Sequence, residues 1–329
     1  MNKKSEGSQI NVSIVVPVYN EVESLPELYD WCSRVFREHQ LSYEVILIDD
    51  GSDDGSWDVI ADLSAKDPQV KGIQFTRNYG KSAALHVGFQ QAAGEVVITM
   101  DADLQDSPDE VPELYRMIME EGYHLVSGWK KKRKDPLEKR LPSKFFNYIT
   151  RLISGIRLHD FNCGLKAYQN RVVKNISVYG EMHRYIPMLA KWNGFKKIGE
   201  KVVAHQARKY GTTKFGFERY IKGFLDLISI VFMTRFSKNP MHFFGTLGSL
   251  SFFTGFVITV YVIADKMYKL YYQLPVRDIV DQPLFFLALV ALIAGIQLFL
   301  TGFIAEMVIL NNPSKNEYLV SNKLNIKHD

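Results

Sequence analysis

The sequence predicts an α/β protein whose Rossmann-like, mostly parallel sheet is followed by amphipathic helices and a two-helix transmembrane hairpin. Up to about residue 204, short β-branched or aromatic runs alternate with amphipathic runs of helical period. This alternation is typical of parallel strands with helices on both faces of the sheet. Beyond it, residues 243–264 and 283–305 contain no Asp, Glu, Lys or Arg. Each stretch is long enough to cross a hydrocarbon core, which takes about 20 apolar residues.

Five strands are expected in the first part of the chain, each a short run bounded by turn residues. They cover Val12–Val16, Glu44–Ile48, Val70–Phe75, Glu95–Met100 and Leu125–Gly128. Four helices are expected between them, over Glu21–Glu38, Ser56–Ala65, Lys81–Ala93 and Pro108–Glu121. The last has Ser107 as its predicted N-cap and Pro108 in its first turn. In sheets of this kind ligands bind beyond the carboxyl ends of the strands, so the chemistry is expected there.

Changes of composition along the chain define its expected segments. A tail over 1–11 precedes an α/β domain over 12–215, which includes a basic amphipathic, membrane-facing segment at 137–156. A juxtamembrane amphipathic helix is expected over 216–240. The two membrane helices, 241–264 and 283–310, are joined by an outside linker over 265–282 and followed by a cytoplasmic tail over 311–329.

The net charge of +4 conceals two basic segments. Ten Lys and Arg stand against two Asp and Glu between Trp129 and His159, and seven against two between His205 and His242. A solvated face and a nucleic-acid groove are alternatives for such segments. Aromatic and aliphatic residues alternate with the bases, however, and this pattern favours helices that lie on an anionic membrane surface over a nucleic-acid site.

The distribution of Lys and Arg also predicts how the hairpin is oriented. Seven lie in the segment before the first apolar stretch and three after the second, whereas the linker contains Lys266, Lys269 and Arg277. By the positive-inside rule, both termini and the α/β domain are expected on the cytoplasmic side of the inner membrane. The charged start of the chain runs directly into a strand, so no signal peptide is expected. Two cysteines exclude a disulfide framework.

Acidic residues are concentrated where three predicted strands end. Glu21 follows the first strand, Asp49 and Asp50 the second, and Asp101 and Asp103 the fourth. Carboxylates this close repel one another unless a cation or hydrogen-bond donors lie among them. An Asp-x-Asp at a strand end is a natural seat for Mg²⁺ or Mn²⁺, which bind through one or two carboxylates plus substrate phosphates.

Other motifs in the same region have plainer interpretations. Asp53-Asp54-Gly55-Ser56 is expected to form a turn and a cap for the following helix. The sequence contains neither Gly-x-Gly-x-x-Gly after a strand nor Gly-x4-Gly-Lys-Ser/Thr. Their absence argues against a dinucleotide oxidoreductase and against a P-loop NTPase.

Five motifs occur in order between residues 12 and 305. They are Pro17-x-Tyr19-Asn20-Glu21, Ile48-Asp49-Asp50-Gly51-Ser52-x-Asp54-Gly55-Ser56, Arg77-Asn78-x-Gly80-Lys81, Asp101-Ala102-Asp103-Leu104-Gln105-Asp106 and Arg208-x-x-Gly211-x-Thr213-Lys214. Together they resemble glycosyltransferase family 2, and within it the polyisoprenyl-phosphate glycosyltransferases, which include dolichol-phosphate mannose synthases. The resemblance implies a GT-A fold. It also implies inverting transfer of a sugar from a UDP- or GDP-linked donor to undecaprenyl or dolichyl phosphate.

The resemblance also assigns expected roles to residues. The donor nucleotide sugar would be bound by Pro17, Tyr19, Glu21, Ile48, Asp49, Asp50, Lys81, Asp101, Ala102, Asp103 and Gln105. The metal, Mg²⁺ or Mn²⁺, would be bound by Asp101, Asp103 and Gln105. The expected catalytic residues are Asp103, Arg184 and Asp160, the last matching an acid near the donor sugar. Phosphates of donor or acceptor would be contacted by Lys130, Arg184, Arg208 and Lys214.

Three alternatives stay open beside this assignment. A processive polysaccharide synthase should carry Gln-x-x-Arg-Trp, whereas Trp192 is preceded here by Lys191, with Met188 in place of the Gln. A non-catalytic membrane scaffold with a nucleotide-binding domain would be expected to lose its metal and phosphate residues, and these are present. Attraction of surface lipids is the alternative for Arg208 and Lys214. A homo-oligomer is a further implied partner, although the tail differs from the Arg-rich, Pro-Tyr ending of two-span members.

Overall fold

The computed structural model of the chain describes residues 10–131, 147–152, 154–206, 209–210, 240–310 and 320–325. The chain divides into two compact units. The first comprises Met1–Tyr220 together with Asn316–Asp329, and the second comprises Ile221–Lys315. The expected helix at 216–240, apart from its last residue, and much of the expected basic segment at 137–156 lie outside the described residues.

The first unit is built on an eight-stranded mixed sheet of order β7-β5-β6-β4-β1-β2-β3-β8. The strands are β1 (Val12–Val18), β2 (Tyr43–Asp49), β3 (Val70–Phe75), β4 (Val96–Thr99), β5 (Leu125–Trp129), β6 (Lys166–Gln169), β7 (Ile198–Val202) and β8 (Val320–Leu324). The central strands β4, β1, β2 and β3 are parallel, as the alternating pattern predicts. β6 runs antiparallel between β4 and β5, and β8 runs antiparallel along β3.

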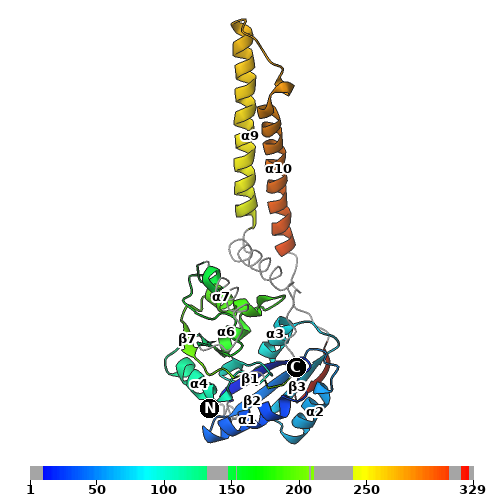
Figure 1. The fold of residues 1–329 in the computed structure, drawn as a ribbon, viewed down its shortest axis with the longest axis vertical. Helices are drawn as coiled ribbons and strands as arrows, with labels where there is room; N and C mark the ends of the chain where they lie inside the picture. Colours follow the sequence, from blue (N-terminus) through cyan, green and yellow to red (C-terminus); the bar gives the residue numbers. More distant parts are fainter. Residues whose placement is uncertain are drawn as a thin grey trace, which may run out of the picture. The chain divides into compact units, whose positions relative to one another are not determined.

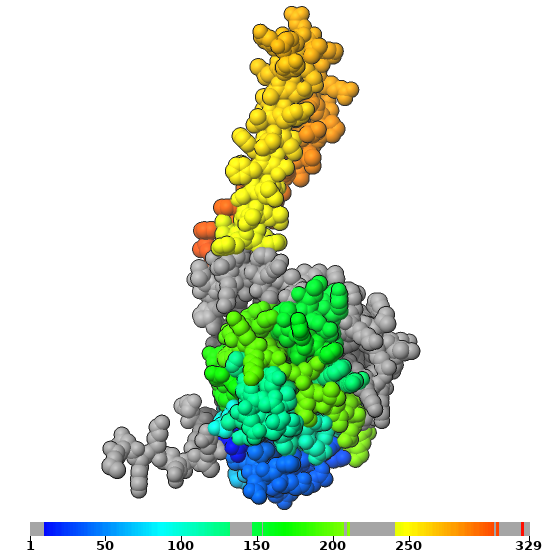
Figure 2. Space-filling view, turned by 90° about the vertical axis from the view of Figure 1, so that its left-hand side faces the viewer, coloured from blue at the N-terminus to red at the C-terminus, as the bar shows by residue number. Residues whose placement is uncertain are grey.

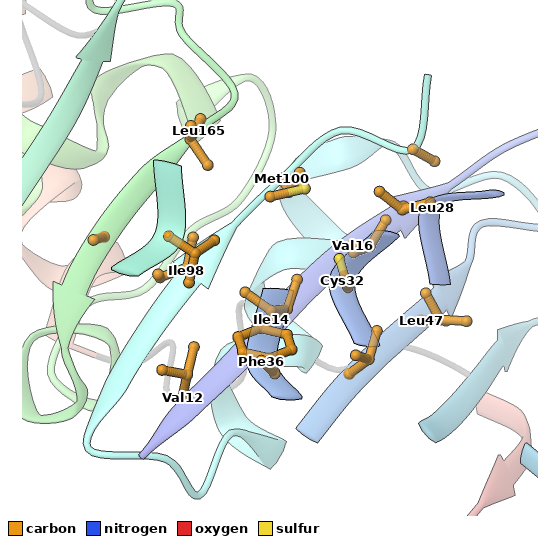
Figure 3. Close-up of a cluster of buried hydrophobic side chains, with 14 of the residues drawn as sticks. Val12, Ile14, Val16, Leu28, Cys32, Phe36, Leu47, Ile98, Met100 and Leu165 are labelled. Atoms are coloured by element: carbon orange, nitrogen blue, oxygen red, sulfur yellow. The ribbon is translucent and has the colours of Figure 1, made fainter. Parts of the chain in front are cut away.

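Helices cover both faces of this sheet (Figure 1). The main helices are α1 (Leu25–Glu38), α2 (Ser56–Lys66), α3 (Lys81–Gln91) and α4 (Val111–Met119), with the shorter α6 (Asn170–Lys174) and α7 (Ile186–Trp192). One core packs α1, α2 and α4 against the sheet, and Figure 3 shows Ile14 and Val16 of β1 facing Cys32 and Phe36 of α1. Because β1 is covered on both faces, nearly all of its residues are buried, as expected for a central parallel strand.

On the opposite face of the sheet, α3 lies unusually close to β1 and β2. A Cβ atom placed on Gly88 would lie 2.4 Å from Val15 Cγ1 and 2.9 Å from Ile48 Cδ1, so only glycine permits this approach. The close packing fixes the position of the whole helix. Its first residue, Lys81, thereby lies next to the carboxyl ends of the central strands.

Several helix boundaries and strands differ from those that the sequence predicts. The helix expected from Glu21 begins at Leu25, because the backbone N–H groups of Glu21 and Val22 donate to Ser56 Oγ and Asp54 Oδ2 at 3.0 and 3.1 Å instead. β6, β7 and β8 were not predicted. β8 lies in the polar tail, and Asn325 fastens it by donating to Ser64 O, Ser64 Oγ and Val70 O at 3.1, 2.7 and 3.0 Å.

The second unit is a hairpin of two long apolar helices, α9 (Pro240–Tyr271) and α10 (Pro283–Leu310). Both are long and apolar enough to cross a membrane, and only 17% and 11% of their most hydrophobic stretches are buried inside the protein. Their large side chains stand on the surface (Figure 2, yellow to orange). Ser251 Oγ donates to Ala291 O at 2.9 Å and links the two helices. α9 continues to Tyr271, beyond the expected end of the first span at Ala264.

Candidate active site

A cleft of about 300 Å³ lies at the carboxyl ends of the central strands, where the sequence predicts the chemistry. Its lining comes from the end of β1, the loop after β2, the loop before α3, the start of α3, and the loop after β4. These lining residues are Pro17, Val18, Tyr19, Glu21, Asp50, Asn78, Gly80, Lys81, Asp101, Ala102 and Asp103. Eight of the predicted donor residues therefore share one cavity: Pro17, Tyr19, Glu21, Asp50, Lys81, Asp101, Ala102 and Asp103.

The loop after β1 is held in place by the loop after β2. Asn20, whose φ is +56°, donates to Asp53 Oδ1 at 2.8 Å and accepts the Asp53 N–H at 3.1 Å. Asp54 accepts the Ser56 N–H at 2.9 Å, so the segment forms the expected turn. The N-cap of α2 is Gly55, and no side chain caps this helix, so the expected cap is not formed by a side chain. Burial would raise the pKa of Asp54, but hydrogen bonds from the Ser56 hydroxyl and from the backbone N–H groups of Val22 and Ser56 lower it. The second loop thus fixes the backbone that presents Tyr19 and Glu21 to the cleft.

Asp50 is a buried carboxyl group at the floor of this cleft, 4% exposed. It accepts the backbone N–H groups of Tyr79 and Gly80 at 2.7 and 2.9 Å. Burial raises the pKa of Asp50 to about 6, against the effect of these two donors. Its neighbour Asp49 is fully buried, and Asp49 Oδ1 accepts the Ser52 N–H at 3.1 Å. Asp49 therefore supports the loop, whereas Asp50 borders the cavity.

Asp101 forms an ion pair with Lys81 across the cleft. Both side chains are about one-third exposed, at 33% and 34%. Burial would raise the pKa of Asp101, but Lys81, with Lys130 and Lys166 farther away, lowers it to about 2. Asp101 is therefore an anion at every physiological pH. Its charge is available to a cation that can compete with the Lys81 ammonium group.

Asp103 and Gln105 lie on the turn that follows β4. Leu104 has a φ of +60°, and Asp103 Oδ1 accepts the Gln105 N–H at 3.2 Å. Asp103 lines the cleft, whereas Gln105 is outside the set of described residues that line it, and Gln105 O accepts the Gln206 N–H at 3.1 Å. The structure thus brings two of the three predicted metal ligands, Asp101 and Asp103, to the cavity.

The segment that carries Asp160 packs behind Asp101. A Cβ on Gly164 would lie 2.5 Å from Asp101 Oδ2, so this backbone approaches the carboxylate closely. Gly164 O accepts the Thr99 hydroxyl at 2.7 Å, and Lys166 Nζ donates to Cys163 O. Asp160 itself is 2% exposed and accepts the Asn162 N–H at 3.0 Å. The sequence predicted a role for Asp160 alone in this segment, and none for Gly164 or Lys166.

Lys130, a predicted phosphate contact, pairs with a buried carboxylate in this structure. Lys130 Nζ lies 2.7 Å from Asp106 Oδ1, and the two side chains are 11% and 0% exposed. Burial would lower the pKa of Lys130, but the Asp106 carboxylate raises it above its usual value. The pair links the end of β5 to the loop after β4. Within the described residues, Lys130 does not line the cleft.

Arg184 and His183 lie on a short 3-10 helix, Met182–Tyr185, beside the start of α3. The Ser82 hydroxyl accepts the His183 N–H at 3.0 Å and also contacts His183 Nδ1 at 3.0 Å. Burial, followed by the charges of Lys81 and Arg184, holds the pKa of His183 well below its usual value, so this ring is neutral. Arg184 lies 3.4 Å from Glu181 Oε2. The predicted phosphate ligands Arg208 and Lys214 lie outside the described residues.

Asn78 and Gly80 line the cleft, although sequence reasoning assigned them no role. The signal for both was their place in the motif Arg77-Asn78-x-Gly80-Lys81. Ile48, in contrast, is fully buried against α3 and is not among the described residues that line the cleft.

Comparisons with known proteins agree with this architecture. Residues 13–177 match the family model "Glycosyl transferase family 2". The chain is 33% identical over 302 residues to dodecaprenyl-phosphate galacturonate synthase of Rhizobium johnstonii, covering 91% of this chain and 88% of that protein. It is 36% identical over 260 residues to undecaprenyl-phosphate 4-deoxy-4-formamido-L-arabinose transferase of Pectobacterium carotovorum, covering 78% and 77%.

Solved structures show the same fold at low sequence identity. Mannosyl-3-phosphoglycerate synthase of Rubrobacter xylanophilus matches with a TM-score of 0.56 and 14% identity, over 69% of this chain and 75% of that one. Glucosyl-3-phosphoglycerate synthase of Mycobacterium tuberculosis, solved with Mn²⁺ and UDP-glucose, matches with a TM-score of 0.52 and 17% identity, over 70% and 80%. These likenesses confirm the expected GT-A fold. With the family match and the two relatives, they establish that the chain is a glycosyltransferase and belongs to glycosyltransferase family 2.

Proposed function

We propose that this protein transfers a sugar from a nucleoside-diphosphate sugar to a polyprenyl phosphate, with inversion at the anomeric carbon, at the cytoplasmic face of the membrane. The observation that carries the proposal is the single cleft in which Asp101 and Asp103 meet Tyr19, Asp50 and Lys81. The two relatives indicate the acceptor class, because each is named for a polyprenyl phosphate. The apolar hairpin would keep the enzyme in the membrane that contains such a lipid.

The cleft is suited to a divalent metal ion that is completed by the donor. The described residues contain no group of three His, Cys, Asp or Glu side chains placed to hold a metal. Two carboxylates, Asp101 and Asp103, do line the cavity. Mg²⁺ and Mn²⁺ commonly bind through one or two carboxylates and take their remaining ligands from substrate phosphates and water. When bound, such an ion would neutralise the diphosphate and so improve it as a leaving group.

The residues of the chain would supply binding and alignment. Tyr19, Glu21 and Asp50 would hold the nucleoside, and Asp50 accepts hydrogen bonds when ionised and can donate one when protonated. Lys81, at the start of α3, would bind a diphosphate oxygen with the favourable dipole of that helix. Asp160 belongs to the segment that packs behind Asp101, and it would help to orient a hydroxyl of the donor sugar. Catalysis would then rest mainly on alignment and charge stabilisation.

The acceptor would need no strong general base. A phosphate monoester has a second pKa of about 6 and is largely dianionic at neutral pH. Arg184 on the adjacent 3-10 helix, together with Arg208 and Lys214, would bind its oxygens. A cationic contact of this kind aligns the nucleophilic oxygen without removing a proton from it.

The sheet topology supports an orientation in which both ends of the hairpin lie on the catalytic side of the membrane. β8 follows α10 in the chain, yet it pairs with β3 in the sheet of the catalytic unit, with Leu324 opposite Gly72. A chain that enters a two-helix hairpin from one domain and ends in the sheet of that domain must return to the same side. The excess of Lys and Arg flanking the hairpin favours the cytoplasm as that side.

The proposal is tested with purified full-length protein, undecaprenyl phosphate and a panel of UDP- and GDP-linked sugars. With Mg²⁺ or Mn²⁺, one donor is expected to give a sugar-bearing lipid. Asp103→Ala and addition of EDTA are each expected to abolish it. Undecaprenol, which lacks the phosphate, serves as the negative control acceptor. Activity that survived both treatments would refute the metal assignment, and full turnover by Asp160→Asn would remove Asp160 from the proposed mechanism.

A further inference from the structure

Lys81 and the proposed metal ion would use the same carboxylate. The Lys81 ammonium group contacts Asp101 Oδ1, and the Gly164 backbone packs closely on the other carboxylate oxygen, Oδ2. The ion pair lies in the cleft itself, where both side chains are partly exposed. An ammonium group and a divalent cation repel each other at contact distance, so each weakens the binding of the other to this carboxylate oxygen.

The rest of the cleft offers the metal little compensation. Asp103 is the second carboxylate of the motif, and the part of the chain that the structure describes holds no third ligand to complete a cluster. A metal ion that reached the cleft without a donor would therefore have to displace Lys81 and rely on water for most of its ligands. The diphosphate of a donor changes this balance, because it brings oxygens for the metal and a new anionic partner for Lys81.

Lys81 is placed to make this exchange. It is the first residue of α3, after Gly80, which has a φ of +93° and lines the cleft. The first turn of a helix carries free N–H groups and a positive dipole end, which attract phosphate oxygens. Lysine has a long flexible stem and three rotatable donors, so its ammonium group can move between two nearby anions.

We propose that Lys81 couples metal binding to donor binding. Its ion pair with Asp101 opposes the binding of a metal ion alone, and this pair opens when the donor diphosphate accepts the Lys81 ammonium group. This inference rests on the proposed function, because it requires a nucleoside-diphosphate donor. It goes further by giving an order to loading, in which the metal ion binds tightly only together with the donor. The coupling is reciprocal, so the metal strengthens nucleotide binding by the same factor by which the nucleotide strengthens metal binding.

The test measures Mn²⁺ binding to the purified full-length protein by the loss of the electron paramagnetic resonance signal of free Mn²⁺. Titrations are run without nucleotide, with UDP and with GDP, on wild type, Lys81→Met and Lys81→Gln. Lys201→Met is the matched control, because Lys201 of β7 forms a similar partly buried pair with Glu110, and neither residue is among the described residues that line the cleft. Nucleotide affinity is measured in parallel by calorimetry with and without Mn²⁺.

In wild type, UDP or GDP is expected to tighten Mn²⁺ binding by at least about tenfold, within the usual range of coupling between sites. Both Lys81 variants are expected to bind Mn²⁺ alone about tenfold more tightly than wild type, since a neighbouring positive charge is gone. Their coupling factor should fall correspondingly, and their nucleotide affinity should drop. Lys201→Met should match wild type in every titration.

Two results would contradict the inference, and only one of them would also contradict the proposed function. If wild type binds Mn²⁺ tightly with nucleotide but the Lys81 variants bind lone Mn²⁺ no better than wild type, the inference is overturned and the proposed function stands. If neither nucleotide promotes Mn²⁺ binding to wild type, the proposed function fails and the inference fails with it.

Discussion

The buried ion pair between Lys130 and Asp106 gives a quantitative prediction about stability. Lys130→Met removes the cation and leaves the Asp106 carboxylate, which is 0% exposed, without its partner at 2.7 Å. Removing one partner of a buried pair typically costs about 3–5 kcal/mol, because the remaining charge is uncompensated. In a domain of this size, each kcal/mol shifts the melting temperature by roughly 2–4 °C. The melting temperature should therefore fall by roughly 6–20 °C.

Thermal unfolding followed by tryptophan fluorescence is the appropriate assay. All four tryptophans, Trp31, Trp57, Trp129 and Trp192, lie in the catalytic unit, so the signal reports the unfolding of that unit alone. The double variant Lys130→Met with Asp106→Asn carries no buried charge at this position. It should recover at least half of the lost stability.

The opposite result would identify Lys130 as a phosphate ligand, as the sequence resemblance implies. In that case Lys130→Met would leave the melting temperature within about 1 °C of wild type, as for most surface substitutions. It would instead raise the KM for the lipid acceptor. Such a result would refute the assignment of Lys130 to a structural pair.

Three further predictions concern other parts of the catalytic unit. Asp50 has a pKa raised from 3.8 to about 6, so the folded state binds more protons than the unfolded state between these values and stability falls as pH rises through them. Asp50→Asn imitates the protonated form, so it should be more stable than wild type by up to about 3 kcal/mol at pH 8 and no more stable than wild type below pH 4. Melting curves across pH check the stability, and calorimetry checks the expected weakening of nucleotide binding. Gly164→Ala places a Cβ 2.5 Å from Asp101 Oδ2 and should lower kcat about 100-fold in the transfer assay, as expected for misplaced catalytic groups. Asn325→Ala removes the bonds to Ser64 and Val70, and should destabilise the unit by about 1–2 kcal/mol in melting experiments and speed tryptic cleavage of the tail.

The central sheet could be predicted from the sequence because its strands are buried on both faces. β1, β2 and β4 read as mostly apolar runs that end in turn residues, and such runs are recognisable without structural information. The cleft followed from them, since the ends of parallel strands meet at one edge. The sequence therefore predicts that the acidic residues after these strands lie close together.

The missed elements are short, partly exposed or far apart in the chain. β8 has the sequence Val-Ser-Asn-Lys-Leu and lies at a sheet edge, where no continuous apolar run is required. Its pairing with β3 joins residues separated by the whole hairpin, and local patterns carry no information on such contacts.

The pairing of Lys130 with Asp106 was missed for a related reason. Lys130 belongs to a strongly basic segment, so its composition favoured a surface role. Its actual partner is fixed by the packing of the β5 end against the loop after β4. Ion pairs of this kind depend on tertiary structure, which charge counts along the sequence do not reveal.

The most direct test of the proposed chemistry is the number of phosphorus atoms in the lipid product and the identity of the released nucleotide. Undecaprenyl phosphate and the active donor are incubated with the enzyme and Mn²⁺, and the products are analysed by mass spectrometry. Transfer of the sugar alone predicts a lipid with one phosphate and release of a nucleoside diphosphate. A lipid diphosphate with release of a nucleoside monophosphate, or free sugar with no lipid product, would contradict the account.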